Sequence, residues 1–228
     1  TAKRAVMGPG NDEFDGADGN DTLDGGPGDD FLPVGSGNDT VTDLEGANII
    51  YGGAGNDTIT TGPGSDEARG EDGDDVLVDG GNDGRARQGY PPAQYLWGGA
   101  GNDSITLNGT SAVEDSVTGD AGNDVIKAGD GPQSIQGGED ADDIDGGAGD
   151  DRINGGNGND TLRGGDGDDT VQGGEGTNVL FGGAGADRIE GGAGQDTVSY
   201  ADRTSPVRVT IGIGGADDGN ATDDSATV

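Results

Sequence analysis

A nine-residue repeat runs through most of the sequence. GGAGNDTIT occupies residues 52–60, and GGAGNDSIT, which differs at one residue, occupies residues 98–106. Blocks of this kind can be read from residue 7 to residue 199 once an irregular stretch at 79–97 and a three-residue insertion at 107–109 are allowed. Because a unit this short cannot bury a hydrophobic face alone, the repeat predicts a stack in which each block packs on its neighbours.

Composition limits what such a stack can contain. The 228 residues include 53 Gly, only 28% are hydrophobic, and the formal net charge is −35. These values also describe a disordered acidic chain, and only the periodicity favours a folded one. The sequence has no Cys to form disulfides and no apolar run long enough to span a membrane. The start at Thr1, without Met or a signal-peptide pattern, predicts a processed or excised segment.

The eighth position of the block is apolar and lies between polar neighbours. This pattern is typical of the central, inward-facing residue of a very short strand, and the many Ile and Val residues favour strand over helix. Glycines at the second and fourth positions predict sharp turns with positive φ. The eighth column consists of Phe14, Leu23, Leu32, Val41, Ile50, Ile59, Ala68, Leu77, Leu96, Ile105, Val117, Ile126, Ile135, Ile144, Ile153, Leu162, Val171, Leu180, Ile189 and Val198.

The sixth position is almost always aspartate. Carboxylates stacked one strand spacing apart, roughly 5 Å, repel one another, which indicates that a cation lies between them. Ca²⁺ fits irregular oxygen cages better than Mg²⁺, and a chain without Cys or His lacks the preferred ligands of zinc and copper. The predicted metal ligands are Asp12, Asp21, Asp30, Asp39, Asp57, Asp66, Asp75, Asp103, Asp115, Asp124, Asp142, Asp151, Asp160, Asp169, Asp187 and Asp196.

Many blocks match the nonapeptide G-G-x-G-x-D-x-U-x, as GGAGNDTIT and GGNGNDTLR do. The chain therefore resembles the RTX, or haemolysin-type, calcium-binding repeat proteins. The resemblance implies an all-β, right-handed parallel β-roll (β-solenoid) with two blocks per turn and Ca²⁺ between blocks i and i+2 on one side.

That geometry assigns the aspartates to two edges and gives nine sites with two carboxylates each. Nine Ca²⁺ ions add about +18 and bring the charge from −35 to about −17. Sites next to the amide residues Asn48, Gln94, Gln133 and Asn178 are expected to be weak, remodelled or empty. One edge is predicted to hold Asp12 and Asp30, then Asp103, Asp124, Asp142 and Asp160. The other is predicted to hold Asp21, Asp39, Asp57 and Asp75, then Asp151, Asp169 and Asp187.

Other functions find little support in the sequence. Without His there is no Ser-His-Asp triad and no HExxH zinc site, and the abundant carboxylates are better explained as Ca²⁺ ligands than as a glycosidase pair, so we expect no enzyme. The negative charge disfavours nucleic acid. Ice binding by a regular Thr column at the third position is rejected, because that column reads Pro9, Asp18, Pro27, Ser36, Ala54, Pro63, Asp72, Ala100 and Ala121.

The domain organisation follows from the repeat. We expect a lead at residues 1–6, the roll at 7–199, and a C-terminal cap strand with a flexible acidic tail at 200–228, where Val207 to Ile213 alternate apolar and other residues. The segment 85–97, RARQGYPPAQYLW, is either a protruding contact site or a loop folded back on the roll. Outward apolar residues at columns seven and nine, such as Tyr51 and Phe181, mark either an assembly face or ordinary exposed strand positions.

The sequence thus predicts a secreted, bacterial-type, calcium-dependent roll that folds outside the cell or at its surface. Weak extracellular sites, with dissociation constants on the order of 10⁻⁴ to 10⁻³ M, stay empty at cytosolic calcium levels. One role is an extracellular structural, adhesive or matrix and filament module with self-association or a cell-surface partner. The alternative is the C-terminal secretion and folding module of a larger secreted enzyme or toxin of the protease, lipase, epimerase or cytolysin type.

Overall fold

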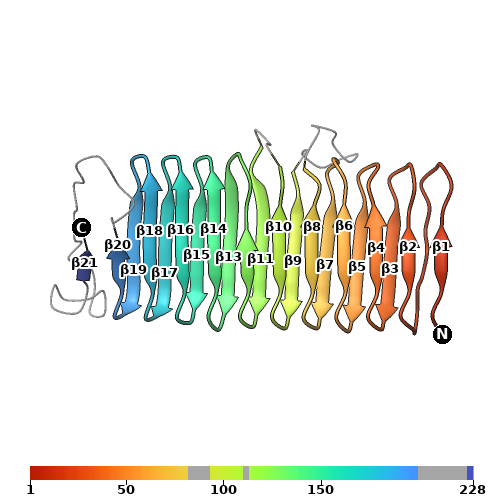
Figure 1. The fold of residues 1–228 in the computed structure, drawn as a ribbon, viewed down its shortest axis with the longest axis horizontal. Helices are drawn as coiled ribbons and strands as arrows, with labels where there is room; N and C mark the ends of the chain where they lie inside the picture. Colours follow the sequence, from red (N-terminus) through yellow and green to blue (C-terminus); the bar gives the residue numbers. More distant parts are fainter. Residues whose placement is uncertain (82–92, 110–112, 200–224, 228) are drawn as a thin grey trace.

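The computed structural model describes residues 1–81, 93–109, 113–199 and 225–227, which form two stacked parallel β-sheets and contain no helix. Figure 1 shows the strands side by side along the long axis, with β1 and β21 at opposite ends. Within the described residues, therefore, no helix is long and apolar enough to cross a membrane.

From β2 to β20, successive strands alternate between the two sheets, so two blocks make one turn, as the β-roll predicts. The 12-stranded sheet contains β1 (Arg4–Val6), β2 (Thr22–Asp24), β4 (Thr40–Asp43), β6 (Thr58–Thr61), β8 (Val76–Asp79), β10 (Ser104–Leu107), β12 (Val125–Lys127), β14 (Asp143–Ala148), β16 (Thr161–Asp166), β18 (Val179–Ala184), β20 (Thr197–Ser199) and β21 (Ser225–Thr227). The 9-stranded sheet contains β3 (Phe31–Ser36), β5 (Ile49–Ala54), β7 (Glu67–Asp72), β9 (Tyr95–Ala100), β11 (Asp115–Ala121), β13 (Gln133–Glu139), β15 (Arg152–Asn157), β17 (Thr170–Gly176) and β19 (Arg188–Gly194).

The eighth column forms the core between the sheets, as predicted. Parallel pairing places like positions side by side, for example Ile144 beside Leu162 and Ile153 beside Val171. Most residues of the column are fully buried, whereas Phe14, Ile189 and Val198 near the ends of the stack are only partly buried. This core is one side chain wide, and each block supplies little hydrophobic stabilisation for the nine residues that it orders.

The irregular stretch at 79–97 changes the predicted order of the turns. The predicted assignment of aspartates to edges assumes two blocks there, but β9 stacks directly on β7, with Tyr95 beside Glu67, and β10 stacks on β8. Among the described residues that follow β8, the stretch therefore contributes one strand, β9, to the stack. Every block after it consequently lies on the opposite edge from the one predicted.

The other irregular segments are placed in part. Residues 85–92 of the predicted contact segment lie outside the described residues, while Tyr95 to Trp97 belong to β9, with Leu96 buried in the core. Leu107 ends β10 and is buried, so the predicted insertion at 107–109 begins after it. The predicted cap strand at 207–213 also lies outside the described residues, but β21, within the tail expected to be flexible, pairs with β20.

The glycines of the repeat allow the turns to stack at close range. Gly122, at the fourth position of its block, has φ of +126°, and a Cβ added there lies 1.7 Å from the carbonyl oxygen of Gly101 in the preceding turn. Both the positive φ and the close approach of backbone to backbone exclude a side chain. The predicted role of the glycine columns is thus confirmed at this position.

Candidate metal centre

The sixth-column residues form two ladders, one along each edge of the roll. The first ladder lies in the turns at the lower edge of Figure 1 and the second in the turns at the upper edge. The first ladder is Asp21, Asp39, Asp57, Asp75, Asp103, Asp124, Asp142, Asp160, Asn178 and Asp196. The second ladder is Asp12, Asp30, Asn48, Asp66, Gln94, Asp115, Gln133, Asp151, Asp169 and Asp187.

The predicted assignment of aspartates to edges is therefore wrong beyond the irregular stretch, although each predicted neighbouring pair is kept. Asp103 to Asp160 continue the ladder that begins at Asp21, and Asp151 to Asp187 continue the ladder that begins at Asp12. The physical reason is the stacking of Asp103 directly on Asp75, where the backbone N–H of Asp75 donates to Asp103 Oδ1 at 2.7 Å. This contact adds a tenth pair of neighbouring carboxylates to the nine predicted.

One oxygen of each stacked carboxylate has a partner in the preceding turn. In all ten pairs of neighbouring aspartates, the backbone N–H of the earlier residue donates to Oδ1 of the later one, at 2.6–3.2 Å. The sequence predicts carboxylate ligands but does not distinguish their two oxygens. The ladder instead ties successive turns together through Oδ1 and leaves Oδ2 for another partner.

The second oxygen is buried and accepts no hydrogen bond at most ladder positions. A buried acceptor without a donor is costly, and a buried negative charge is more so. This is the case at Oδ2 of Asp12, Asp21, Asp30, Asp39, Asp57, Asp66, Asp75, Asp103, Asp115, Asp124, Asp142, Asp151, Asp160 and Asp169.

A main-chain carbonyl oxygen lies beside this second carboxylate oxygen. A Cβ added to Gly119, at the first position of its block, lies 2.2 Å from Asp124 Oδ2 and 2.6 Å from the carbonyl oxygen of Gly137 in the next turn. The same arrangement recurs at Gly70 and Gly155. Two acceptors thus flank a space that exists only because the first position is glycine.

These carboxylate and carbonyl oxygens are suitable ligands for a hard divalent cation. Ca²⁺ binds six to eight oxygens from carboxylates, carbonyls and water. Within the described residues, no group of three or more acidic side chains is placed to hold a metal ion, so carbonyl oxygens must complete the coordination. When bound, Ca²⁺ supplies the positive charge that balances the negative charge of the ladder carboxylates.

Burial raises the pKa of many ladder carboxyls above their usual value of 3.8. The pKa rises to about 7 at Asp57, Asp103, Asp142 and Asp151, and to about 8 at Asp66. Desolvation is the main cause and neighbouring carboxylates add to it, whereas the hydrogen bond from the preceding backbone N–H lowers the pKa. Without a cation, therefore, these five carboxyls keep their protons to a much higher pH in the folded chain than a free aspartate does.

Lowering the pH is therefore expected to stabilise the calcium-free fold, and so to substitute in part for bound calcium. Because the pKa of Asp57 and of Asp103 is about 7 in the folded chain and 3.8 in the reference state, the folded chain binds more protons than the unfolded one. This contribution to stability is complete below about pH 4 and is lost as the pH rises through about 7. In a chelator, far-UV circular dichroism should show β-sheet growing from pH 7 to pH 4. A calcium-free chain equally unstructured at both pH values would contradict the burial of the ladders.

The amide residues of the ladders behave differently from one another. At Gln94, Oε1 accepts the backbone N–H of Asp66, and Nε2 donates to the carbonyl oxygens of Gly64 at 2.7 Å and Gly81 at 3.2 Å. The amide hydrogens of Gln94 thus occupy turn carbonyls that could otherwise bind a cation, which supports the prediction of a remodelled site. Asn48 and Asn178 keep the ladder hydrogen bond through Oδ1, but their buried Nδ2 atoms have no partner.

Two buried carboxylates were missed because they lie outside the sixth column. Asp43 and Asp79 occupy the first position, where most blocks have glycine, and both are fully buried. A signal existed in the sequence, since each follows an inward eighth-column residue, Val41 or Leu77, by two positions and therefore shares its face of the strand.

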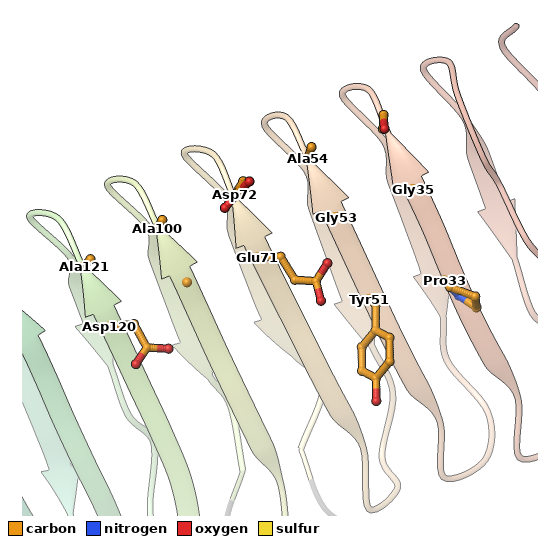
Figure 2. A pocket seen from close by; sticks show the side chains of 12 residues that line it. Pro33, Gly35, Tyr51, Gly53, Ala54, Glu71, Asp72, Ala100, Asp120 and Ala121 are labelled. Atoms are coloured by element: carbon orange, nitrogen blue, oxygen red, sulfur yellow. The ribbon is translucent and has the colours of Figure 1, made fainter.

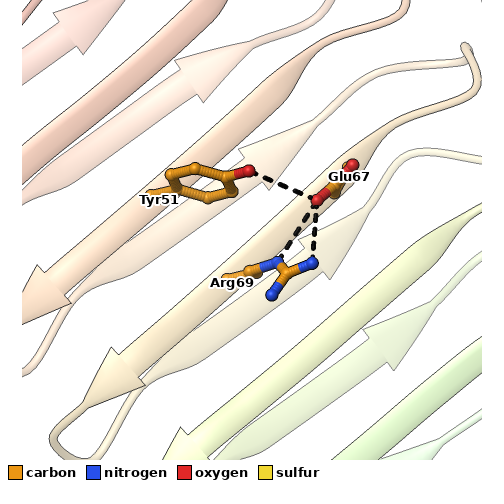
Figure 3. A network of polar contacts seen from close by, with 3 residues as sticks. All are labelled: Tyr51, Glu67 and Arg69. Atoms are coloured by element: carbon orange, nitrogen blue, oxygen red, sulfur yellow. Dashed lines mark hydrogen bonds and ion pairs between the residues drawn. The ribbon is translucent and has the colours of Figure 1, made fainter.

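The outer face of the 9-stranded sheet carries an aromatic patch that we define as Phe31, Tyr51, Arg69, Tyr95 and Trp97. The Arg69 guanidinium lies 4.3 Å from the centre of the Trp97 ring and 5.6 Å from that of Tyr51. Figure 3 shows Arg69 and the Tyr51 hydroxyl both directed at Glu67, with Arg69 Nη2 at 3.0 Å from its Oε1. The patch is thus an ordered surface.

A groove of about 760 Å³ crosses the same sheet next to the aromatic patch. In Figure 2, Tyr51 stands at one side of the groove, and the carboxylates of Glu71 and Asp120 lie along it. Small residues such as Ala54 and Ala100 also line the groove. The groove therefore combines one aromatic side chain, that of Tyr51, with several acidic groups.

Comparison with known proteins identifies the family. The model of the RTX calcium-binding nonapeptide repeat matches residues 8–32, 33–68, 60–83, 94–109, 112–132, 128–162 and 163–198. The chain belongs to this family of calcium-binding β-roll repeats. None of the curated proteins compared with the chain matches it.

Among solved structures, the fold is similar to that of a hyperactive, Ca²⁺-dependent, β-helical antifreeze protein from an Antarctic bacterium. The two chains are 25% identical with a TM-score of 0.60, and the match covers 87% of this chain and 67% of the other. The neighbour is thus a Ca²⁺-dependent protein with the same kind of parallel β-solenoid.

Proposed function

We propose that Ca²⁺ binds between successive aspartates of both ladders and that the roll folds only with these ions in place. The observation that carries the proposal is the buried, unpartnered Oδ2 beside a main-chain carbonyl oxygen, repeated from turn to turn. Family membership and the Ca²⁺-dependent neighbour also support it. The sixteen aspartates predicted from the sequence would hold the ions, with the strongest sites at the ten carboxylate pairs.

Comparison of two aspartates tests where the ions bind. Asp124 lies between the carboxylates of Asp103 and Asp142, whereas Asp196 follows the amide of Asn178. Asp124→Ala should therefore weaken calcium-dependent folding by about tenfold in the calcium midpoint, or roughly 1.4 kcal/mol. Asp196→Ala, the matched control, should shift the midpoint less. Calcium titrations monitored by circular dichroism measure both, and equal shifts would contradict the assignment.

The role that we propose is a secreted structural or adhesive module that folds outside the cell. Millimolar extracellular calcium fills weak sites that cytosolic calcium leaves empty. The aromatic patch and its groove offer a surface for self-association or for a cell-surface partner, since aromatic residues and Arg are enriched in such contacts. We propose no catalytic activity for this chain.

The alternative role, a secretion and folding module of a larger enzyme or toxin, uses the same calcium sites. Electron microscopy of the calcium-loaded chain separates the two roles. Ordered filaments or sheets, lost on Trp97→Ala, would support the structural module. Monomeric particles together with a hydrolase or toxin domain in the same polypeptide would support the alternative.

Ice binding is not transferred from the antifreeze neighbour. The third column of this chain has no regular Thr residues. Outward Thr pairs occur on β4 and β6, where Thr40 and Thr42 lie beside Thr58 and Thr60, but β8 presents Val76 and Val78 in the same positions. An array of Thr pairs that is only two strands wide is small for binding the face of an ice crystal.

A further inference from the structure

Asp43 lines the gap between two turns together with Asp30. A Cβ added to Gly25 lies 2.3 Å from Asp43 Oδ2 and 2.6 Å from Asp30 Oδ2. Asp43 is 0% exposed and neither of its carboxylate oxygens has a hydrogen-bond partner, and Asp30 Oδ2 has none either. Two carboxylates thus meet in a space closed to water.

The gap beside Gly25 differs from the gap beside Gly119 because both of the oxygens that line it belong to carboxylates. Beside Gly119 the second oxygen is the neutral carbonyl of Gly137, whereas beside Gly25 it belongs to the carboxylate of Asp43. The next ladder residue after Asp30 is the amide Asn48, so this pair of turns lacks one ladder carboxylate. Asp43 supplies a negative charge to this gap in place of the carboxylate that Asn48 lacks.

The surroundings of Asp43 do not neutralise this charge. The charged side chains that act on Asp43 or are acted on by it are Asp30, Asp24 and Asp66, all negative, and the nearby backbone N–H of Glu45, which lowers the pKa of Asp43, is neutral. The buried Nδ2 of Asn48 donates to no acceptor, so it does not compensate the pair. Two carboxylates at this distance and burial need either a cation or a shared proton.

We propose that Asp30 and Asp43 bind a divalent cation of their own, Ca²⁺ in the calcium-loaded chain, at a position that the nonapeptide repeat does not specify. The inference rests on the proposed calcium-dependent fold and adds one site to it. Asp43 is the ligand that makes this site different from the ladder sites, because it occupies a position that is glycine in most blocks.

Asp79 provides a matched comparison within the same column. It is also 0% exposed, but Oδ1 accepts the Thr61 hydroxyl at 3.3 Å and Oδ2 accepts the backbone N–H of Gly81 at 2.9 Å. Both of its oxygens therefore have protein donors. Burial and column position are the same for the two residues, and only Asp43 has unsatisfied oxygens.

The number of bound ions tests the proposal. Native mass spectrometry of the calcium-loaded full chain is expected to show one ion fewer for Asp43→Asn than for the wild type, and no change for Asp79→Asn. Asp43→Ala, which removes the carboxylate without restoring the repeat glycine, should also lose one ion, so the result does not depend on one variant folding.

An unchanged ion count in both Asp43 variants would overturn the proposal. A shared proton would then account for the pair. A wild-type chain that binds no calcium at all would instead overturn the proposed function along with this site, so the two failures are distinguishable.

Discussion

Removing calcium with a chelator at neutral pH is expected to abolish the β-sheet structure of the whole roll. The ladders then place stacked, buried carboxylates in a chain of net charge −35, and the one-residue-wide core cannot compensate for their burial. Because each turn contacts only its neighbours, loss of the ions acts along the full stack. Far-UV circular dichroism should show a disordered chain that regains its β signal at roughly 10⁻⁴ to 10⁻³ M calcium.

Magnesium provides the control for this experiment. Mg²⁺ carries the same charge but demands octahedral geometry and gives up its water reluctantly, so equal magnesium should restore much less structure. Recovery of the same β signal with magnesium or with high monovalent salt would indicate simple charge screening. A chain that keeps its full β signal in chelator at neutral pH would contradict metal-dependent folding.

Gly122→Ala is expected to be among the most damaging small substitutions in the regular part of the roll. The added Cβ lies 1.7 Å from the carbonyl oxygen of Gly101 and 2.5 Å from its carbonyl carbon, and φ is +126°. Since the obstacle is backbone, it cannot rotate away, and the turn must separate from its neighbour. We expect a loss of about 3 kcal/mol or more in the free energy of unfolding in saturating calcium.

Gly8→Ala is the matched control for Gly122→Ala. A Cβ on Gly8 meets no atom within 4 Å, and its φ is not in the left-handed region, so the change in stability should be within about 0.5 kcal/mol. Thermal unfolding of both variants in the same calcium buffer makes the comparison. Similar stabilities would show that the turns are not packed as closely as described.

The sequence predicted the features that repeat in every block. The inward face of each strand was readable because Ile144 and its equivalents recur at one position between polar neighbours, and the parallel stacking places them side by side. The ladder positions were readable because Asp and Gly recur together. A strict nine-residue period thus predicts the local structure and whether each side chain points into the core or outward.

Features that do not repeat from block to block could not be predicted from the nine-residue period. The edge occupied by Asp103 depends on whether residues 79–97 contribute one strand or two, and only the stacking of β9 on β7 decides it. The role of Oδ1 as an acceptor for the preceding turn depends on the spacing between turns. Asp43 was overlooked because its importance comes from its contact with Asp30, one turn away, rather than from its column.

A crystal structure of the chain grown in millimolar calcium, with the ions identified by anomalous diffraction, tests the central claim most directly. The account predicts Ca²⁺ between neighbouring carboxylates of both ladders, for example between Asp57 and Asp75 and between Asp124 and Asp142, with Oδ2 and main-chain carbonyl oxygens as ligands. Ladder carboxylates turned outward into water, or no ion beside them at saturating calcium, would contradict it.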